Sequence, residues 1–390
     1  MGVMEPHSPK DVGSYIEAWK HPLATRLTRL QQGTTRVGYF YEVPDTGTFR
    51  YRAYNMAQML NTHSEKYSAS YFFLSDLPLV ESFADYIDVF VLVRFRFGGG
   101  IGRLIDQAHA RGKTVLFDID DLIFDWSHTS TIASTLNFGL EPGLVLDNWY
   151  ALSTRLGHAL RLCDGAITTT PTLQHHVTAT AGIDAAVIPN FLNAEQLEVS
   201  AALRNGRPPA TPTFTVGYFS GSKSHARDFA VASDALARFL AQHSHARLVV
   251  AGILDMPAVL DDLQSQITRL PFMDYLSLQA RVAEVDLNIV PLQENPFTDG
   301  KSELKYFEAA AVSTITLASP TEVYSRVITH GHNGFLASAD GWLSALEMVA
   351  SLEDTERTAI AKHALEDTLG TYTPEAQIQH LETTLERFIR

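Results

Sequence analysis

Two series of short apolar runs and amphipathic segments, separated by a polar linker, constrain the fold of this 390-residue chain more than any other feature. Apolar runs that alternate with helical patterns predict parallel sheets covered by helices. We therefore predict an α/β protein with two Rossmann-like, doubly wound domains that face each other across a cleft. The first series of predicted strands covers residues 35–43, 69–74, 88–95, 114–118, 165–169 and 186–189. The second series covers residues 213–219, 247–252, 268–270, 286–290 and 314–318.

The linker RNGRPPATP, residues 204–212, is rich in proline, glycine and polar side chains and sets the domain boundary. The N-terminal domain is predicted at 32–203 and the C-terminal domain at 213–372. A last amphipathic helix, 373–390, is expected to pack back on the N-terminal domain.

Residues 1–31 form a predicted helical extension. Trp19, Leu23 and Leu27 recur at helical spacing, and Pro22 interrupts the pattern, so two short helices are expected. A helix packed on the body of the protein is the simpler interpretation. The alternative is a helix that contacts a membrane surface or a partner protein.

The formal net charge of −14 argues against a nucleic-acid partner, because proteins that bind polyanions are usually basic. The single cysteine, Cys163, excludes an internal disulfide framework and indicates a reducing compartment. Residues 1–12 lack the apolar stretch of a secretory signal, and no run of about 18 apolar residues predicts a spanning helix. We therefore expect a cytoplasmic protein whose only membrane contact is peripheral, at the inner face.

Residues 295–319 have the pattern of a loop and helix between two strands, a place where such folds bind anions. A polar loop precedes a helical pattern, SELKYFEAAA, and a β-branched run follows it. Unpaired N–H groups and the positive end of the helix dipole stabilise phosphate at such a position. The N–H groups are expected from Ser302, Glu303 and Leu304, with the ammonium groups of Lys301 and Lys305 beside them. The sequence therefore predicts a diphosphate site.

The runs EAAAVSTITLAS, from residue 308, and GHNGFL, from residue 331, resemble the C-terminal signature of family 4 glycosyltransferases of the GT-B fold. Residues 301–305 resemble a bacterial surface-polysaccharide branch of that family. The resemblance implies transfer of a sugar from a nucleotide-diphosphate donor to an acceptor hydroxyl with retention of configuration. Glu308 matches the family glutamate that bonds the ribose. The other family glutamate, which contacts the sugar, falls at Gly300.

Further donor contacts are implied by the same resemblance. The loop after the first strand of the C-terminal domain carries Ser222, Lys223 and Arg227, where the family grips the diphosphate. A solvated turn is the alternative there. Phe272 lies in the segment that contacts the base in the family, and core packing is its alternative.

The acidic run DIDD gives the N-terminal domain its own candidate chemistry. Asp118, Asp120 and Asp121 are expected on the acceptor side, with Asp118 or Asp120 as proton acceptor. Structural caps are one alternative, and a magnesium-dependent phosphatase or a metal-binding D-x-D motif is another. The resemblance to family 4 glycosyltransferases implies that His128 faces the donor sugar.

Gly47, Arg50 and Arg52 follow the first predicted strand and are expected to bind the acceptor. The two arginines suit a phosphate of a lipid-linked glycan, or they are simply solvated. The loop at 97–102 imitates a dinucleotide fingerprint but has Arg103 at the last glycine position, so no nicotinamide cofactor is predicted. Histidine pairs such as His175–His176 lack the spacing of a metal cage.

Together these patterns predict a metal-independent glycosyltransferase without a resident cofactor. Its partners are a nucleotide-sugar donor and a carbohydrate or lipid-linked glycan acceptor, in glycan or polysaccharide assembly. A non-catalytic subunit that binds nucleotide sugar, and the phosphatase built on Asp118 and Asp120, remain as alternatives.

Overall fold

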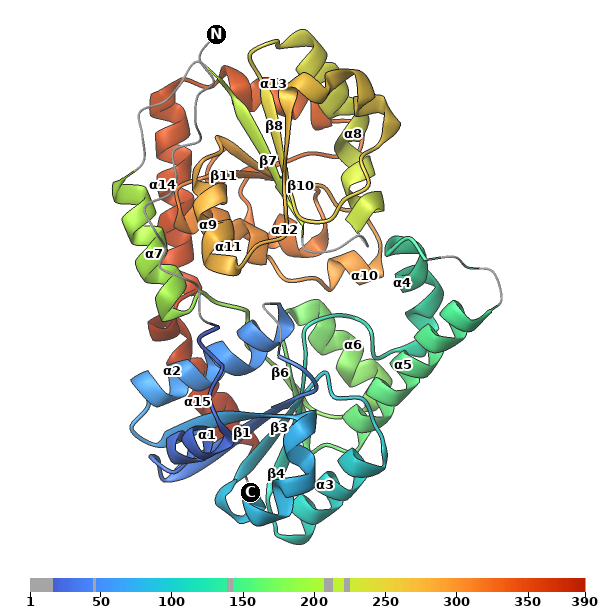
Figure 1. The fold of residues 1–390 in the computed structure, drawn as a ribbon, viewed down its shortest axis with the longest axis vertical. Helices are drawn as coiled ribbons and strands as arrows, with labels where there is room; N and C mark the ends of the chain where they lie inside the picture. The colour runs from blue at the N-terminus through green and yellow to red at the C-terminus, as the bar shows by residue number, and fades with distance from the viewer. Residues whose placement is uncertain are drawn as a thin grey trace.

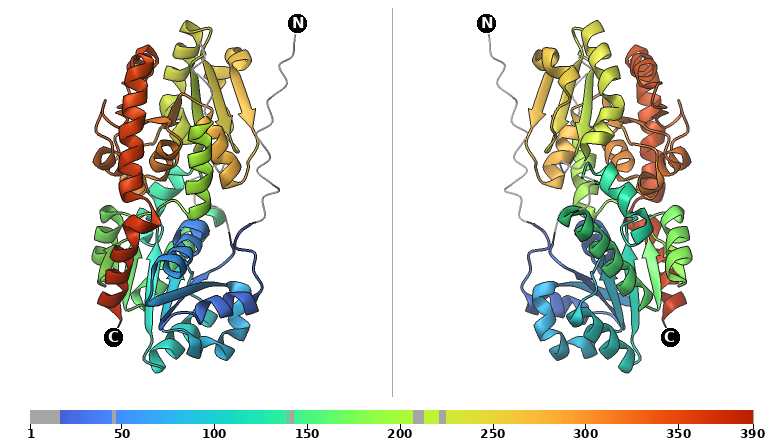
Figure 2. Two further views of the ribbon diagram at one scale, coloured as in Figure 1. Left: turned by 90° about the vertical axis from the view of Figure 1, so that its left-hand side faces the viewer. Right: turned by 90° about the vertical axis from the view of Figure 1, so that its right-hand side faces the viewer.

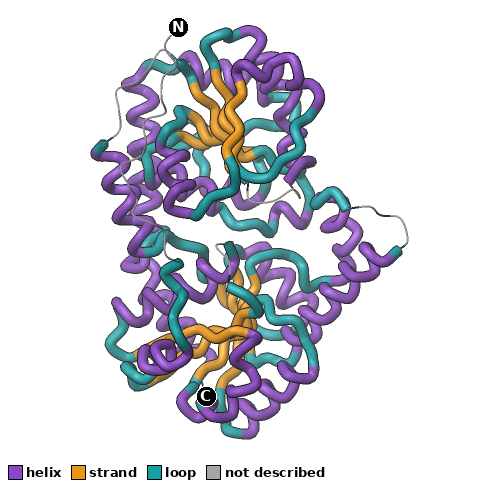
Figure 3. Tube along the Cα trace, in the orientation of Figure 1, coloured by secondary structure: helices purple, strands orange, loops and turns teal. Residues whose placement is uncertain are grey.

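The computed structural model describes residues 17–44, 47–138, 140, 143–206, 213–220 and 225–389. It has two α/β domains, one above the other in Figure 1, each with a parallel sheet enclosed by helices. Figure 3 shows the two groups of strands at the centres of the two domains, with helices on both sides of each. The prediction of two facing Rossmann-like domains is therefore confirmed.

The N-terminal sheet has the strand order β2-β1-β3-β4-β5-β6, and every pairing in it is parallel. Valine, phenylalanine and leucine dominate its central strands, because helices cover both faces and each side chain is buried. The strands are β1 Thr35–Tyr41, β2 Tyr67–Phe73, β3 Val89–Val93, β4 Thr114–Ile119, β5 Gly165–Thr168 and β6 Ala185–Val187.

The helices of this domain connect successive strands. A π-helical turn, Arg50–Tyr54, runs directly into α2 Asn55–His63. The others are α1 Leu23–Leu30, α3 Gly99–Ala110, α4 Thr129–Thr135, α5 Leu144–Arg161, α6 Pro171–Ala181 and α7 Ala194–Asn205. Short 3-10 segments lie at Leu74–Ser82, Ala84–Tyr86 and Trp126–His128.

From residue 17 on, the N-terminal extension packs on the body of the protein. Arg26 of α1 is buried and donates to both carboxylate oxygens of Asp76, at 2.7 and 3.1 Å. Trp19 is 1% exposed and stacks at 6.3 Å on Tyr275 of the other domain. The first of the two predicted helices falls largely on residues outside the described part of the chain.

The C-terminal sheet has the order β12-β11-β10-β7-β8-β9, again all parallel. Its strands are β7 Thr215–Phe219, β8 Arg247–Ala251, β9 Ile267–Leu270, β10 Leu287–Val290, β11 Ile315–Ala318 and β12 Phe335–Leu336. Strand order reverses between β7 and β10, so a crevice opens at the carboxyl ends of these two strands.

Helices α8 Ala226–Gln242, α9 Tyr275–Ala283, α10 Pro296–Asp299, α11 Leu304–Ala311, α12 Glu322–Val327 and α13 Trp342–Ser351 surround this sheet, with a 3-10 segment at Ala258–Gln266. Helix α14 Asp354–Thr371 then leads to α15 Pro374–Phe388. Figure 2 shows α15, in red, reaching down along the N-terminal domain. There Lys66 pairs with Glu386 at 2.7 Å. Within the described residues, no helix combines the length and apolarity needed to cross a membrane.

Candidate active site

Three cavities follow one another along the cleft between the domains. The inner cavity, of about 190 Å³, is walled by Phe219, Ser220, Phe272, Asn288 and Glu308, among others. The central cavity, of about 490 Å³, shares Gly47, Tyr51, Leu304 and Lys305 with the inner one. The outer cavity, of about 570 Å³, shares Tyr41, Arg94, Asp121, His225 and Lys301 with the central one.

The inner cavity lies at the switch point of the C-terminal sheet. Phe219 ends β7, and Asn288 lies on β10 with its amide donating to the carbonyl of Lys305 at 3.1 Å. The ring of Phe272 lines this cavity and is 56% exposed, unlike the core aromatic rings. An exposed aromatic face beside a polar cavity suits stacking on a planar ligand.

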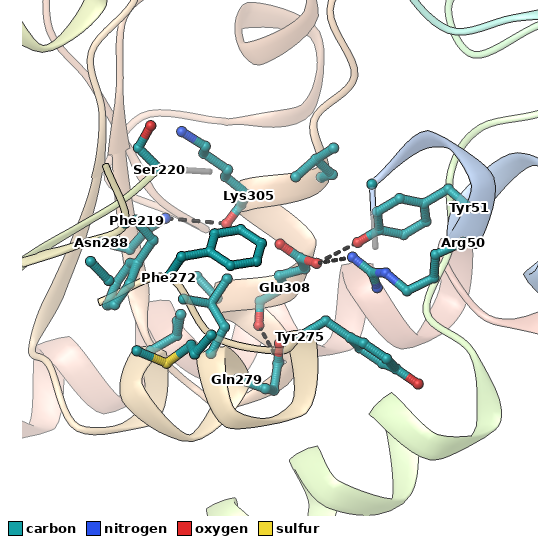
Figure 4. Close-up of a pocket in the computed structure, with 18 of the residues that line it drawn as sticks. Arg50, Tyr51, Phe219, Ser220, Phe272, Tyr275, Gln279, Asn288, Lys305 and Glu308 are labelled. Atoms are coloured by element: carbon teal, nitrogen blue, oxygen red, sulfur yellow. Dashed lines mark hydrogen bonds and ion pairs between the residues drawn. The ribbon is translucent and has the colours of Figure 1, made fainter. Parts of the chain in front are cut away.

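Glu308, on α11, separates Phe272 from the N-terminal domain (Figure 4). Its Oε1 accepts hydrogen bonds from Arg50 Nη2 at 3.2 Å and from the Tyr51 hydroxyl. Gln279 donates to its main-chain carbonyl at 2.7 Å and so fixes this turn of α11. The carboxylate is therefore held in one position at the cavity wall, which favours it as a ligand for hydroxyl groups.

These contacts correct the role predicted for the two arginines. Arg50 is 4% exposed, and its guanidinium stacks on the rings of Tyr51 and Tyr275 while it pairs with Glu308. Arg50 therefore forms part of the wall of the inner cavity and does not bind a phosphate of the acceptor. Arg52 is fully buried and makes a two-pronged ion pair with Asp118, both bonds at 2.8 Å.

Asp118 is likewise fully buried, because β4 is a central strand covered on both faces. Among the described residues it lines none of the three cavities, so the predictions that it is a proton acceptor on the acceptor side or a phosphatase nucleophile are wrong. Burial raises the pKa of Asp118 although the Arg52 charge opposes this. Its function is to pair Arg52, which also donates to the Ile188 carbonyl at 2.8 Å.

Helix α11 begins at Leu304, two residues later than predicted. The first helical N–H groups are therefore those of Leu304 and Lys305, both at the walls of the inner and central cavities. Ser302 lines the central cavity from the loop. Glu303 is 3% exposed, and its carboxylate accepts from the Tyr372 hydroxyl at 2.8 Å, so its side chain is a support and not a donor ligand.

Two ammonium groups stand at the start of α11. Lys301 Nζ lies 4.4 Å from the centre of the Phe297 ring and 3.9 Å from Asp121. Lys305 Nζ lies 5.2 Å from the centre of the Tyr218 ring. Burial, together with the charge of Lys301, lowers the pKa of Lys305 to about 8. Positive charge and helical N–H groups therefore converge on one wall.

The opposite wall carries Asp120 and Asp121, joined by Arg94, which pairs with both carboxylates. Thr48 also donates to Asp120 at 3.1 Å. Burial raises the pKa of Asp120, whereas the Lys301 and Arg94 charges outweigh burial and lower that of Asp121. Sequence reasoning missed Arg94. Its one sequence signal was its place directly after a buried strand, and in the structure its φ is +43°.

His225 lines both the central and the outer cavity, and its Nδ1 lies 3.1 Å from Asp228 Oδ2. Asp228 is buried and accepts from the Gln293 side chain at 3.0 Å. Burial lowers the pKa of His225 despite this carboxylate. The imidazole is thus oriented at the boundary of the two cavities.

Several predicted residues are not brought to the cavities. His128 contacts Asp125 and the ring of His176 instead. Arg227 is exposed and bonds Ser134 and Asn137 across the domain boundary, at 2.8 and 3.0 Å. Ser222 and Lys223 lie outside the described residues.

Position 300 is crowded by leucine side chains of the N-terminal domain. Gly300 is buried, and a Cβ there would lie 3.1 Å from Cδ2 of Leu173 in the N-terminal domain. A carboxylate at this place would face leucine side chains and not the cleft. The absence of the glutamate therefore follows from how closely the domains approach here.

Comparison with known proteins agrees with this architecture. Residues 213–352 match the family described as Glycosyl transferases group 1. The match covers the switch-point crevice, α11 and the lysines at its start. The resemblance to group 1 glycosyl transferases of the GT-B fold is therefore confirmed. No curated protein matches the chain.

Solved structures of glycosyl transferases share the whole fold. A sucrose-phosphate synthase from Thermosynechococcus elongatus has 14% identity and a TM-score of 0.62, over 90% of this chain and 98% of that one. Anabaena HepE, solved with UDP and glucose, has 16% identity and a TM-score of 0.59, over 90% and 99%. A glycosyltransferase from Rickettsia africae ESF-5 has 12% identity and a TM-score of 0.62, over 91% and 98%. The family match and the shared fold support sugar transfer from a nucleotide-sugar donor.

Proposed function

We propose that this chain transfers a sugar from a nucleoside-diphosphate sugar to an acceptor hydroxyl with retention of configuration. One observation carries the proposal. The Phe272 ring and the Glu308 carboxylate line the inner cavity, Lys305 lines both the inner and the central cavity, and Lys301 lines the central cavity. The aromatic ring suits the base of the donor, the carboxylate suits the ribose hydroxyl groups, and the ammonium groups suit the diphosphate.

The donor fits the inner and central cavities together better than it fits either cavity alone. The inner cavity alone, about 190 Å³, is smaller than the few hundred Å³ usual for a ligand site. With the base on Phe272 and the ribose at Glu308, the diphosphate reaches the first N–H groups of α11. The sugar then lies in the central cavity, against Ser302 and Lys301.

The reaction needs negative charge to be stabilised as the glycosidic bond lengthens. Two ammonium groups and the amino end of α11 are already in place, so no rearrangement is required when charge develops on the leaving diphosphate. Lys301 is the nearer of the two lysines to the acceptor side, because it lines both the central and the outer cavity.

The acceptor enters through the outer cavity. Arg94, Asp121 and His225 stand where it opens into the central cavity. We propose that Asp121, whose carboxylate lies 3.9 Å from Lys301, contacts the sugar in place of the glutamate missing at position 300. Asp120, with its raised pKa, is the proposed proton acceptor.

The outer cavity also has an apolar wall, which includes Leu136, Trp149, Leu152 and Leu156. This wall favours a lipid-linked glycan over a free sugar as the acceptor. A place in glycan or polysaccharide assembly, in the cytoplasm at the inner face of a membrane, follows from such an acceptor. UDP is the first nucleotide to test, because Anabaena HepE was solved with UDP.

The test is incubation of the purified chain with UDP-, GDP-, ADP-, TDP- and CMP-sugars, with and without glycan acceptors. Release of the nucleotide, which is a nucleoside diphosphate from the first four donors and CMP from CMP-sugars, reports turnover, and an NMR spectrum of the new anomeric centre reports configuration. The proposal expects release from one donor class and a product with the donor's configuration. Tight nucleotide binding without release under any condition indicates the non-catalytic subunit instead, and an inverted product contradicts retention.

A further inference from the structure

A group of metal-ligand side chains lies in the N-terminal domain, away from the residues that line the three cavities. Asp125, His128 and His176 each offer one ligand atom, and these atoms all lie within 4.8 Å of one another. The sequence places Asp125 and His128 three residues apart but His176 far along the chain. The fold brings them together by packing the turn after β4 against α6.

Both imidazole rings are available as metal ligands. Their rings meet edge to face at 5.2 Å, and within the described residues neither ring has a hydrogen bond to another group. Asp125 is held in place by Ser127 and by Thr180, which donates to Oδ2 at 3.0 Å. All three residues are partly exposed, so an ion can enter and keep a water molecule as a further ligand.

We propose that Asp125, His128 and His176 bind one divalent transition-metal ion of the zinc class. Two neutral imidazoles and a carboxylate form a ligand set typical of zinc, whereas calcium and magnesium prefer oxygen ligands alone. His128 Nε2 and Asp125 Oδ2 are 4.0 Å apart. Ligand atoms of a tetrahedral zinc ion lie about 3.4 Å apart, so small side-chain rotations complete the site.

This site changes one expectation. The pair His175–His176 lacks the spacing of a metal cage in the sequence, but the fold brings Asp125 and His128 to His176. A bound ion would fasten the turn at 125–128 to α6. Helix α4 starts at the next residue, Thr129, and its last residue, Thr135, accepts a hydrogen bond from Asn295 of the other domain at 3.1 Å. The ion would thus hold α4, which contacts both domains, in place. This inference does not depend on the proposed function.

The experiment measures zinc binding to the whole chain by competition with a chromophoric chelator. We expect one zinc ion per chain, and affinity that falls roughly tenfold or more in His128→Ala and in His176→Ala. Zinc should also raise the melting temperature of the wild type but not of His176→Ala. Magnesium at the same concentration should do neither.

Two variants serve as matched controls. His175→Ala removes the exposed neighbour on α6, and His332→Ala removes half of another histidine pair, His332–His363, whose rings stack at 4.1 Å. Both should bind zinc as the wild type does. The inference is overturned by a wild type that binds no zinc, or by zinc binding that survives in His176→Ala. Circular dichroism and His128→Gln, which keeps a similar volume, separate loss of a ligand from loss of the fold.

Discussion

Lys305 and Lys362 have the same side chain but different surroundings. Lys362 is exposed on α14 and lies 3.6 Å from Glu366, a pair that contributes little in water. Lys305 stands at the cavity wall, where burial lowers its pKa to about 8. At the residue scale, the site depends on such local environments, and each gives a separate test.

The first prediction concerns pH. Lys305 carries its charge below its pKa of about 8 and loses it above, so donor affinity should fall as pH rises from 7 to 9. Lys305→Arg should bind with little change over this range, because arginine stays charged. Lys305→Met should bind weakly throughout. Titration calorimetry with the nucleoside diphosphate at each pH checks this, and an identical pH dependence in wild type and Lys305→Met would contradict it.

The second prediction concerns the buried pair of Arg52 and Asp118. Arg52→Met leaves the Asp118 carboxylate buried without its partner, which should cost about 3–5 kcal/mol of unfolding free energy. Asp354→Asn, at an exposed pair on α14, should cost under about 1 kcal/mol. Urea denaturation measures both. Equal stability of the two variants would show that Asp118 is not the structural residue described here.

The third prediction also uses pH. Although burial raises it, hydrogen bonds from Arg36 and Lys113 lower the pKa of Asp88 from 3.8 to about 2. A carboxylate with a lowered folded pKa stabilises the protein above pH 4, and this contribution disappears as the pH falls toward 2. Asp88→Asn should therefore be less stable than the wild type at pH 7, with the difference shrinking in acid. A constant difference between pH 7 and pH 3 would contradict this.

At the element scale, local sequence patterns were enough for most strands and for α11, because their apolar periodicity reflects burial within one domain. They were not enough for α10, a single turn whose cap, Asn295, is set by tertiary contacts as well as by its own sequence. Lys301 and Lys305 were predicted from their places on one strand–helix unit, and Glu308 was predicted from the resemblance to the glycosyltransferase family. Arg94 and Tyr51 could not, because their contacts cross between strands or domains that lie far apart in the sequence.

The fourth prediction tests the connection before α11. Gly300→Glu should not restore the family's sugar contact, because the new side chain meets Leu173 and Leu122. Burying this carboxylate should lower stability by about 2–4 kcal/mol and reduce turnover. Gly370→Glu, where no atom lies within 4 Å of the added Cβ, is the matched control and should be close to neutral. Higher turnover in Gly300→Glu would refute this explanation of the missing glutamate.

At the scale of the whole molecule, the chain returns to its first domain through α15. Phe388 packs so closely on β5 that a Cβ at Gly165 would lie 2.3 Å from its ring. Together with contacts across the cleft, such as the hydrogen bond from the Tyr51 hydroxyl to Glu308, this return holds the two domains together. The amphipathic pattern at 373–390 predicted the helix and its packing on the N-terminal domain, but the contact of Phe388 with Gly165 is seen only in the fold.

The fifth prediction is that the two domains unfold together. Calorimetry of the wild type should show one unfolding transition, because the contacts of α15 contribute to the stability of both domains. Phe388→Asp places a charge against β5 and should release α15, so that the transition broadens or splits. Arg387→Ala removes an exposed ion pair with Asp184 and a contact of the guanidinium with the Phe388 ring at 5.3 Å, but it keeps that ring on β5 and should keep one transition. Two well-separated transitions in the wild type would contradict this.

The most direct test of the central claim is the affinity of the preferred nucleoside diphosphate, measured by titration calorimetry on single variants. If the donor lies along Phe272, Glu308 and Lys301, then Phe272→Ala, Glu308→Gln and Lys301→Met should each weaken binding roughly tenfold or more. Lys362→Met, at an exposed lysine of α14, should bind as the wild type does. Unchanged affinity in all three cavity variants would place the nucleotide elsewhere and contradict the account.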